Sequence, residues 1–581
     1  MRKAVFFRRA AGFAAVLAVS VFLTPARGAT TQYGFHAPVV LPDSYDGSEP
    51  SLAISTDGIR YPSWQSPGEF ARSSDGIHFT NIGMPDEAAV GDVTNAIDAS
   101  GALFNGQICG DAQNVLHTCV YRSTDGGKTW PQKTQLADNH PGASDRPWID
   151  VYPHRRAGSW NPDETTVYLE YHTFSPEELT YVTVSTDGGK TFSLPKMVSS
   201  DTNAIESSAC NTVPGGVAVD DKSGAAYAVW LSGDDVTQNA ATGCNYSQIG
   251  PFTKAWVSTS TDGGNTWTSH LAWHGDYDPT TNVGDNASKL FASIAVDAEG
   301  RPSILLAVRH HDDPLGLVTE CESARASMTD CKEDPQPTDL LLASSPDQGA
   351  TWTAPHKINK DTGSYFFPWI AAGSGGTIVA IYYKSTTLSP NDDASVWYAG
   401  SAQITGVNPV RSGDGAAYAS EPVTREVLLD PAPVHKSGIC TYGTFCAAVP
   451  NSNRNLADSL VISLDPSGGA NAVWTNDAAV PPEPEGPQIP DPNAPDEQSK
   501  QIVQYACQNS GPSAFATQPA LSACFAKAAV SPNPPGPEVL GGKQRRTLPG
   551  TGVGDDATNA LAVLMLAGAA AIFTRRILRL V

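Results

Sequence analysis

The sequence predicts an all-β protein: a six- or seven-bladed β-propeller, seven favoured, with four-stranded antiparallel blades. Two repeated patterns predict this fold. One is a turn with the spacing Ser-x-Asp-x-Gly-x-Thr-aromatic, as in "STDGGKTW" from Ser123. The other is a hairpin in which two apolar strands flank a Gly-rich turn, as in "VISLDPSGGANAVW" from Val461. Recurrence of one supersecondary unit is typical of repeat folds, and a closed ring of four-stranded sheets protects its sheet edges.

The hairpin pattern occurs seven times. Its β-branched and aromatic residues alternate as in strands, and its Gly-rich turns disfavour helices. The seven hairpins begin at Leu52, Asn95, Trp148, Gly216, Ser293, Trp369 and Val461. In four units a third strand, the Ser-x-Asp-x-Gly turn and a fourth strand follow. Seven hairpins therefore favour seven blades.

The acidic residue of the repeated turn is expected to be structural. An Asp side chain can accept hydrogen bonds from the backbone amides of its own turn, and Gly supplies the positive φ that such a turn needs. The aromatic residue that follows is expected to pack between sheets. The alternative is a catalytic or metal-binding role for these four residues, which are Asp125, Asp187, Asp262 and Asp347.

The N-terminal 28 residues have the pattern of a secretory signal peptide. A basic start precedes an apolar run from Ala10 to Leu23, which is too short to span a bilayer, and small residues precede Ala29. The propeller is then expected over residues 29–528, with a Pro-rich stalk over 529–547.

The C-terminal residues 548–581 combine a pentapeptide, an apolar segment over 557–573 and a basic tail. This order resembles the sortase sorting signal of Gram-positive bacteria. The resemblance implies cleavage between Thr551 and Gly552 and attachment to the cell wall, with Leu548 and Pro549 in the recognised pentapeptide. The alternative is a plain membrane anchor that follows a chance pentapeptide. The expected location is the cell surface, with sortase and the cell wall as partners and membrane contact only through this segment.

Charge and cysteine content narrow the function further. The net charge of −23 argues against nucleic acid and anionic lipid as partners. Ten cysteines in an exported chain favour disulfides, and none has the CxxC spacing of a metal site. We therefore expect no cofactor, and nothing in the sequence supports calcium. Neighbouring cysteines suggest the pairs Cys109/Cys119, Cys210/Cys244, Cys321/Cys331, Cys440/Cys446 and Cys507/Cys524.

One face of the propeller collects charged and aromatic residues. Antiparallel strands alternate in direction, so the hairpin turns and the Ser-x-Asp-x-Gly turns lie at the same face, here called the lower face. The upper face receives the residues that precede each inner strand or follow each second strand. A planar guanidinium suits a carboxylate, and aromatic faces suit sugar rings. The binding candidates are Arg146, Arg309, Arg454, Trp148 and Trp369, and the catalytic candidates are Asp145, Glu206 and Tyr365.

The turns "STDGGKTW", "STDGGKTF", "STDGGNTW" and "SPDQGATW" resemble the Asp-boxes, or bacterial neuraminidase repeats, of the sialidase superfamily. The resemblance covers Asp75 to Trp352, and the hairpin repeat extends it to about Gln508. It implies an arginine triad for a sialic carboxylate, matched by Arg146, Arg309 and Arg454. It also implies a Tyr nucleophile activated by a Glu, and an Asp acid/base, for which Tyr365, Glu206 and Asp145 are the candidates.

The sequence departs from that family in two ways. It lacks the Phe/Tyr-Arg-Ile-Pro motif of active sialidases, and it has seven hairpins where they have six blades. The first hypothesis is therefore a surface module that binds extracellular glycans or proteins, without established catalysis. The alternative is an exo-α-sialidase or another exo-glycosidase. A third reading assigns the arginines to structural ion pairs.

Overall fold

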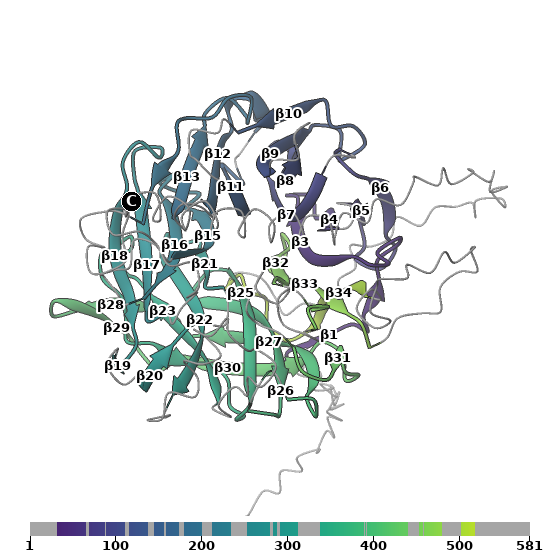
Figure 1. The fold of residues 1–581 in the computed structure, drawn as a ribbon. Helices are drawn as coiled ribbons and strands as arrows, with labels where there is room; N and C mark the ends of the chain where they lie inside the picture. The colour runs from purple at the N-terminus through teal and green to yellow at the C-terminus, as the bar shows by residue number, and fades with distance from the viewer. Residues whose placement is uncertain are drawn as a thin grey trace, which may run out of the picture.

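In the computed structural model, the chain forms a ring of β-sheets around a central axis (Figure 1). Seven antiparallel blades are formed by the described residues, which confirms the blade number favoured by the sequence. The structure describes residues 32–65, 69–86, 89–110, 116–136, 144–155, 158–173, 179–199, 212–233, 252–278, 283–287, 291–311, 337–388, 390, 392–439, 453–456, 458–478 and 501–516.

Blades 1 to 4 each contain four consecutive strands, with the first nearest the axis. Blade 1 comprises β3 (Ser48–Ile54), β4 (Arg60–Gln65), β5 (Glu69–Arg72) and β6 (Thr80–Gly83). Blade 2 comprises β7 (Ala89–Ile97), β8 (Leu103–Gly110), β9 (Leu116–Ser123) and β10 (Gln132–Gln135). Blade 3 comprises β11 (Ser144–Tyr152), β12 (Thr166–Thr173), β13 (Thr180–Ser185) and β14 (Lys196–Met197), with the 3-10 turn η1 (Pro162–Glu164) between its first two strands. Blade 4 comprises β15 (Thr212–Val219), β16 (Ala226–Ser232), β17 (Lys254–Ser260) and β18 (Thr268–His274).

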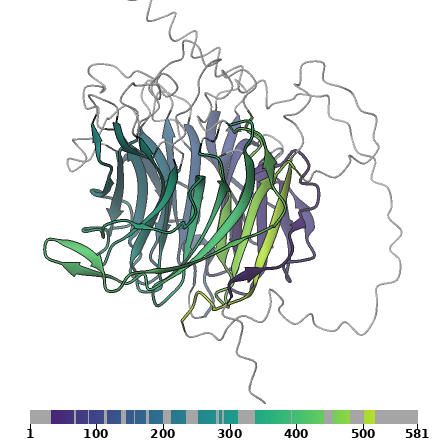
Figure 2. The same ribbon diagram turned by 90° about the horizontal axis from the view of Figure 1, so that it is seen from below.

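Blades 5 and 6 carry additional strands. Blade 5 comprises β21 (Ser293–Val296), β22 (Pro302–His311), β23 (Thr338–Ser344) and β24 (His356–Lys357), and β20 (Val283–Asn286) pairs with β22 and with β19 (Tyr277–Asp278). Blade 6 comprises β25 (Ser364–Ala372), β26 (Thr377–Ser385), β27 (Val396–Thr405) and β30 (Val423–Leu428), and β31 (His435–Lys436) also pairs with β27. The hairpin of β28 (Pro409–Ser412) and β29 (Gly415–Tyr418) projects from the outside of the ring (Figure 2).

Both ends of the described chain meet in blade 7, which closes the ring. Its strands β32 (Val461–Leu464), β33 (Ala470–Asn476) and β34 (Ile502–Ser510) come from the C-terminal part. The outer positions are taken by β1 (Gly34–Phe35) and β2 (Val39–Val40), which both pair with β34. Pairing between distant segments covers the strand edge that an open blade would expose.

The lower face is made of short hydrogen-bonded turns. The turn between β13 and β14 is representative, because Asp187 accepts hydrogen bonds from the backbone amides of Lys190 (3.1 Å) and Thr191 (2.9 Å) and from the Thr191 hydroxyl (2.6 Å). Burial is the largest single effect and opposes ionisation, but the hydrogen bonds together outweigh it and lower the pKa of Asp187. Gly188 and Gly189 have φ of 71° and 80°. The bond from the Thr amide four residues on recurs at Asp125, Asp262 and Asp347, whereas Asp75 accepts from the amides of Ile77 and His78.

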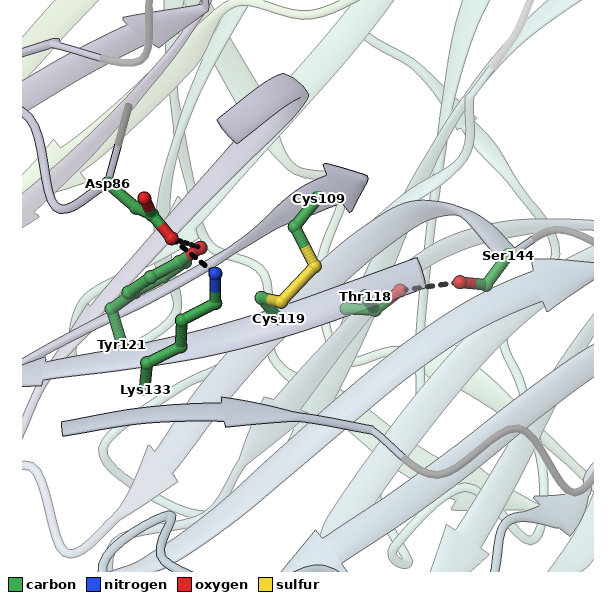
Figure 3. Close-up of a disulfide and its surroundings, with 7 residues drawn as sticks. All are labelled: Asp86, Cys109, Thr118, Cys119, Tyr121, Lys133 and Ser144. Carbon is green, nitrogen blue, oxygen red and sulfur yellow. Dashed lines mark hydrogen bonds and ion pairs between the residues drawn. A yellow bond between two sulfur atoms is a disulfide. The ribbon is translucent and has the colours of Figure 1, made fainter. Parts of the chain in front are cut away.

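A disulfide joins the second and third strands of blade 2 (Figure 3). Cys109 on β8 bonds diagonally to Cys119 on β9, since the register places Cys109 opposite His117. This disulfide confirms the pair expected from the sequence. Nearby, Asp86 accepts a hydrogen bond from the Tyr121 hydroxyl (3.1 Å) and forms an ion pair with Lys133. Cys507 is also disulfide-bonded. The pairs Cys210/Cys244, Cys321/Cys331 and Cys440/Cys446, and Cys524, lie outside the described residues.

Both predicted terminal signals lie outside the described residues, and so does the Pro-rich stalk. Among the residues that the structure describes, no helix is long and apolar enough to cross a membrane. The last of these residues, Gly511 to Ala516, run along the lower face. There the Ala514 amide donates to Gly468 O (2.8 Å) and the Ser374 amide donates to Ala514 O (2.9 Å). The described part of the chain therefore ends at the lower face (Figure 2).

Replacing the turn carboxylate tests its structural role. Asp187→Ala should lower the free energy of unfolding by about 1–2 kcal/mol, because three donors of the turn lose their acceptor. Urea denaturation followed by tryptophan fluorescence measures the loss. Asp414→Ala, in the exposed turn between β28 and β29, is the matched control and should be neutral. Equal effects of the two substitutions would contradict a structural role for Asp187.

Candidate functional site

The inner strands of five blades are interrupted near their upper ends by β-bulges. The register shifts lie between Ser48/Ser51, Ala89/Val93, Asp145/Trp148, Pro214/Gly216 and Phe366/Trp369. In four of these blades the bulge holds a residue other than Gly at positive φ: Glu49 (46°), Asp92 (31°), Arg146 (51°) and Phe367 (51°). A bulge redirects a side chain, and left-handed backbone at such residues costs free energy and is concentrated at functional sites. This repeated strain marks the upper end of the axis as a candidate site.

The bulges of blades 1, 2 and 3 bring opposite charges together. Arg146 Nη1 forms ion pairs with Glu49 Oε2 and with Asp92 Oδ1, the latter at 3.2 Å. Arg454, which precedes blade 7, lies with Nη2 2.5 Å from Asp458 Oδ2 and 4.0 Å from Glu49 Oε1. We call Glu49, Asp92, Asp145, Arg146, Arg454 and Asp458 the upper cluster. It joins side chains from four blades at one point.

Aromatic rings surround the central guanidinium. The Arg146 guanidinium carbon lies 5.0 Å from the ring centroid of Trp148 and 5.0 Å from that of Phe291, which is cation–π geometry. Trp148 in turn packs on Trp369, with centroids 4.7 Å apart. Trp148 and Trp369 line a cavity of about 540 Å³ that extends along the axis to lower-face residues such as Asp221. Of the sequence-predicted residues, Trp148 therefore contacts both Arg146 and Trp369.

Arg146 is bonded on one side only. Its side chain is 5% exposed, and Nη1 is held by the two carboxylates. Its Nε and Nη2 atoms are buried and have no hydrogen-bond partner among the described residues. Buried polar groups in proteins almost always have a partner, which is often water or a ligand. The Nε–Nη2 edge is thus a pair of parallel donors that needs an acceptor.

Burial and charge separate the pKa values of the three acidic residues around Arg146. Burial raises the pKa of Glu49 well above its usual value, although Arg146 opposes this. Burial also raises the pKa of Asp92, to about 6, again against Arg146. Burial of Asp145 acts in the same direction, but hydrogen bonding to His172 and its charge outweigh it and leave the pKa lowered. Asp92 is therefore protonated more readily than Asp145.

The second arginine is more accessible. The Arg454 side chain is 26% exposed and its partner Asp458 16%. Burial alone would raise the pKa of Asp458, but Arg454 and Arg146 outweigh it, so the pKa is lowered. The carboxylates Glu49 and Asp458 raise the pKa of Arg454 despite its burial. This pair therefore remains ionised.

Three candidates from the sequence lie elsewhere or cannot be placed. Tyr365 packs in the hydrophobic cluster between blades 5 and 6, where its hydroxyl donates to Asp361 O (3.3 Å) and its ring lies 5.5 Å from Lys384 Nζ. Burial raises its pKa, which disfavours a phenolate. Arg309 lies on β22 with a buried side chain, paired in register with Asn286 and Thr338. Glu206 lies outside the described residues.

The sequence reasoning did not identify Glu49, the closest partner of Arg146. A signal for it was present, because Pro follows the left-handed residue in three blades, as Glu49-Pro50, Arg146-Pro147 and Phe367-Pro368. Within the part of the chain that the structure describes, no group of three or more His, Cys, Asp or Glu side chains is arranged to hold a metal ion.

Comparisons with known proteins give only distant similarities. No protein-family model matches the chain, and no curated protein matches it. Among solved structures, a protein of unknown function from Dyadobacter fermentans is 15% identical, over 82% of this chain and 98% of that chain, with a TM-score of 0.38. An ulvan lyase is 12% identical over 77% and 92%, with a TM-score of 0.41, and a Hadza microbial sialidase is 12% identical over 78% and 74%, with a TM-score of 0.36. At these scores the similarities carry no conclusion about activity.

Removing the central guanidinium tests the charge balance of the upper cluster. Arg146→Ala should lower the free energy of unfolding by about 3 kcal/mol at pH 8, because it leaves Glu49 buried without its partner. Arg146 stabilises the ionised carboxylates, so the loss should shrink at pH 5, where Asp92 is protonated. Denaturant titrations at the two pH values measure this.

The control is Arg411→Ala, whose side chain is 67% exposed in its ion pair with Asp347. It should cost about 0.5 kcal/mol or less. If Arg146→Ala lowers the free energy of unfolding by as little, or by an amount that does not vary with pH, Arg146 does not stabilise the ionised Glu49 and Asp92.

Proposed function

We propose that the chain is a carbohydrate-binding propeller that holds an acidic sugar of an extracellular glycan at the upper cluster. The observation that carries the proposal is the open Nε–Nη2 edge of Arg146. Two parallel N–H donors of a guanidinium match the two oxygens of a carboxylate. The rings of Trp148 and Phe291, which also contact each other, both pack against that guanidinium. A sugar carboxylate would supply the missing acceptor.

The proposal requires that the negative charge of the ligand be tolerated. Glu49, Asp92, Asp145 and Asp458 all lie in the cluster, and only two arginines balance them. Protonation of Asp92, with its pKa near 6, lowers this repulsion, and burial raises the pKa of Glu49 and so favours its neutral form. Binding of an anionic sugar should therefore strengthen as the pH falls through about 6.

Binding is placed before hydrolysis because, among the described residues, the candidate nucleophile Tyr365 packs between blades 5 and 6. Tyr365 contacts Asp361 and Lys384, which are not part of the upper cluster. One observation favours the second candidate, an exo-α-sialidase or related exo-glycosidase. The separated pKa values of Asp92 and Asp145 are the pattern of an acid and a base in one site.

Membership of the sialidase superfamily is part of the proposal. Support comes from the lower-face turns, which share one hydrogen-bonding scheme at Asp125, Asp187, Asp262 and Asp347. Export and wall attachment through Thr551 are also proposed. The Cys109–Cys119 disulfide suits an oxidising compartment. The last described residues lie at the lower face, so attachment on that side would present the upper cluster away from the wall.

Binding of simple glycosides tests the proposed function. The full chain should bind the α-methyl glycoside of N-acetylneuraminic acid or methyl glucuronide more tightly than methyl galactoside, and more tightly at pH 5 than at pH 8. Arg146→Lys keeps the positive charge but removes the two parallel N–H donors, so it should weaken binding about tenfold or more. Isothermal titration calorimetry measures the affinities, with Arg411→Lys as the matched control.

No preference for the acidic glycosides, or equal affinity of Arg146→Lys, would exclude the proposed site. Release of a fluorescent aglycone from an α-sialoside decides between the two candidates. Turnover that is lost in Asp145→Asn would establish the hydrolase, and its absence would leave the binding module.

Wall attachment has its own test. Peptides from the purified wall fraction of an expressing Gram-positive host should end at Thr551, linked to wall material, and Thr551→Ala should shift the protein to the membrane fraction. Recovery of an intact C-terminus in wild type would contradict processing by sortase.

A further inference from the structure

A second buried polar group lies beside the upper cluster, between blades 6 and 7. Asp477 directly follows β33, and both its oxygens accept from His435 Nδ1, at 2.9 and 2.7 Å. The His435 and Asp477 side chains are 2% and 10% exposed. The Asp477 amide also donates to Val434 O (3.0 Å). We call these two side chains the His435–Asp477 pair.

This pair is connected to the site by one residue. Asn455 Nδ2 donates to Asp477 Oδ2 (2.8 Å), and Asn455 itself is 4% exposed. Its neighbour Arg454 is the second arginine of the upper cluster, and Asp458 is its ion-pair partner. Arg454 and Asp458 therefore lie on the same short segment as Asn455, whose side chain is hydrogen-bonded to Asp477.

Local bonding fixes that backbone further. The Asn455 amide donates to Asn453 Oδ1 (2.9 Å), and Leu456 is fully buried in the main hydrophobic cluster. Leu456 thus holds one side of the segment in the core, while Asn455 holds it to Asp477. Arg454 points from this segment to Glu49 and Asp458.

We propose that the His435–Asp477 pair positions the arm that carries Arg454 and Asp458, and so sets how well the upper cluster binds its ligand. The pair has no contact with any residue of the upper cluster among those described; it acts through Asn455. A carboxylate that is hydrogen-bonded to a histidine has a fixed orientation, and a group that orients a binding residue affects affinity without touching the ligand. The inference rests on the proposed function.

The first test does not need a ligand. Phenylglyoxal modifies accessible arginines, and mass spectrometry of the full chain gives the modification rate at each one. Asp477→Asn and His435→Gln should both raise the rate at Arg454 about fivefold, as expected for coupled neighbours, while exposed Arg411 stays unchanged. Unchanged reactivity of Arg454 in both folded variants would overturn the proposal.

The second test is a double-mutant cycle on binding of the acidic glycosides. Asp477→Asn should weaken binding about fivefold in wild type and have no effect once Arg454→Ala is present, because the pair acts through Arg454. An equal loss in both backgrounds would show a general structural role and overturn the proposal. If wild type binds no acidic glycoside, the proposed function fails, and the Arg454 reactivity alone then decides the positioning role.

Discussion

The structure of the upper face depends on the contact of Arg146 with Glu49 and Asp92. These residues come from the first strands of blades 3, 1 and 2, and each occupies a left-handed bulge position. Removal of charges from water is costly, and mutual attraction offsets it only when the geometry is good and the remaining donors and acceptors are satisfied. The bulges supply that geometry by turning the three side chains toward the axis. Strain in the backbone is thus linked to charge pairing at the site.

The pKa values of two upper carboxylates, Glu49 and Asp92, shift in the opposite direction from those of the lower-face turns. At the lower face, Asp187 and its equivalents accept hydrogen bonds from their own turns, which lowers their pKa values and stabilises the turn. At the upper face, burial raises the pKa values of Glu49 and Asp92. The lower carboxylates stay ionised at neutral pH, whereas Asp92 at the upper face changes its charge near pH 6. This difference is the physical reason for assigning structure to one face and ligand binding to the other.

Much of the fold could be predicted because it depends on local patterns. Strand alternation and Gly-containing turns located all seven hairpins, and proximity in the chain located Cys109–Cys119. The site was harder, since a bulge breaks the two-residue period on which the prediction of side-chain direction depends. Glu49 was missed for that reason. Tyr365 lies directly before the bulge between Phe366 and Trp369. Its side chain packs between blades 5 and 6.

The most direct test of the proposed site is a crystal structure of the full chain with bound methyl glycoside of N-acetylneuraminic acid at pH 5. The account predicts that the sugar carboxylate occupies the open edge of Arg146, with an oxygen at about 2.9 Å from each of Nε and Nη2. A sugar bound at another place, or water alone on that edge at saturating ligand, would contradict the central claim.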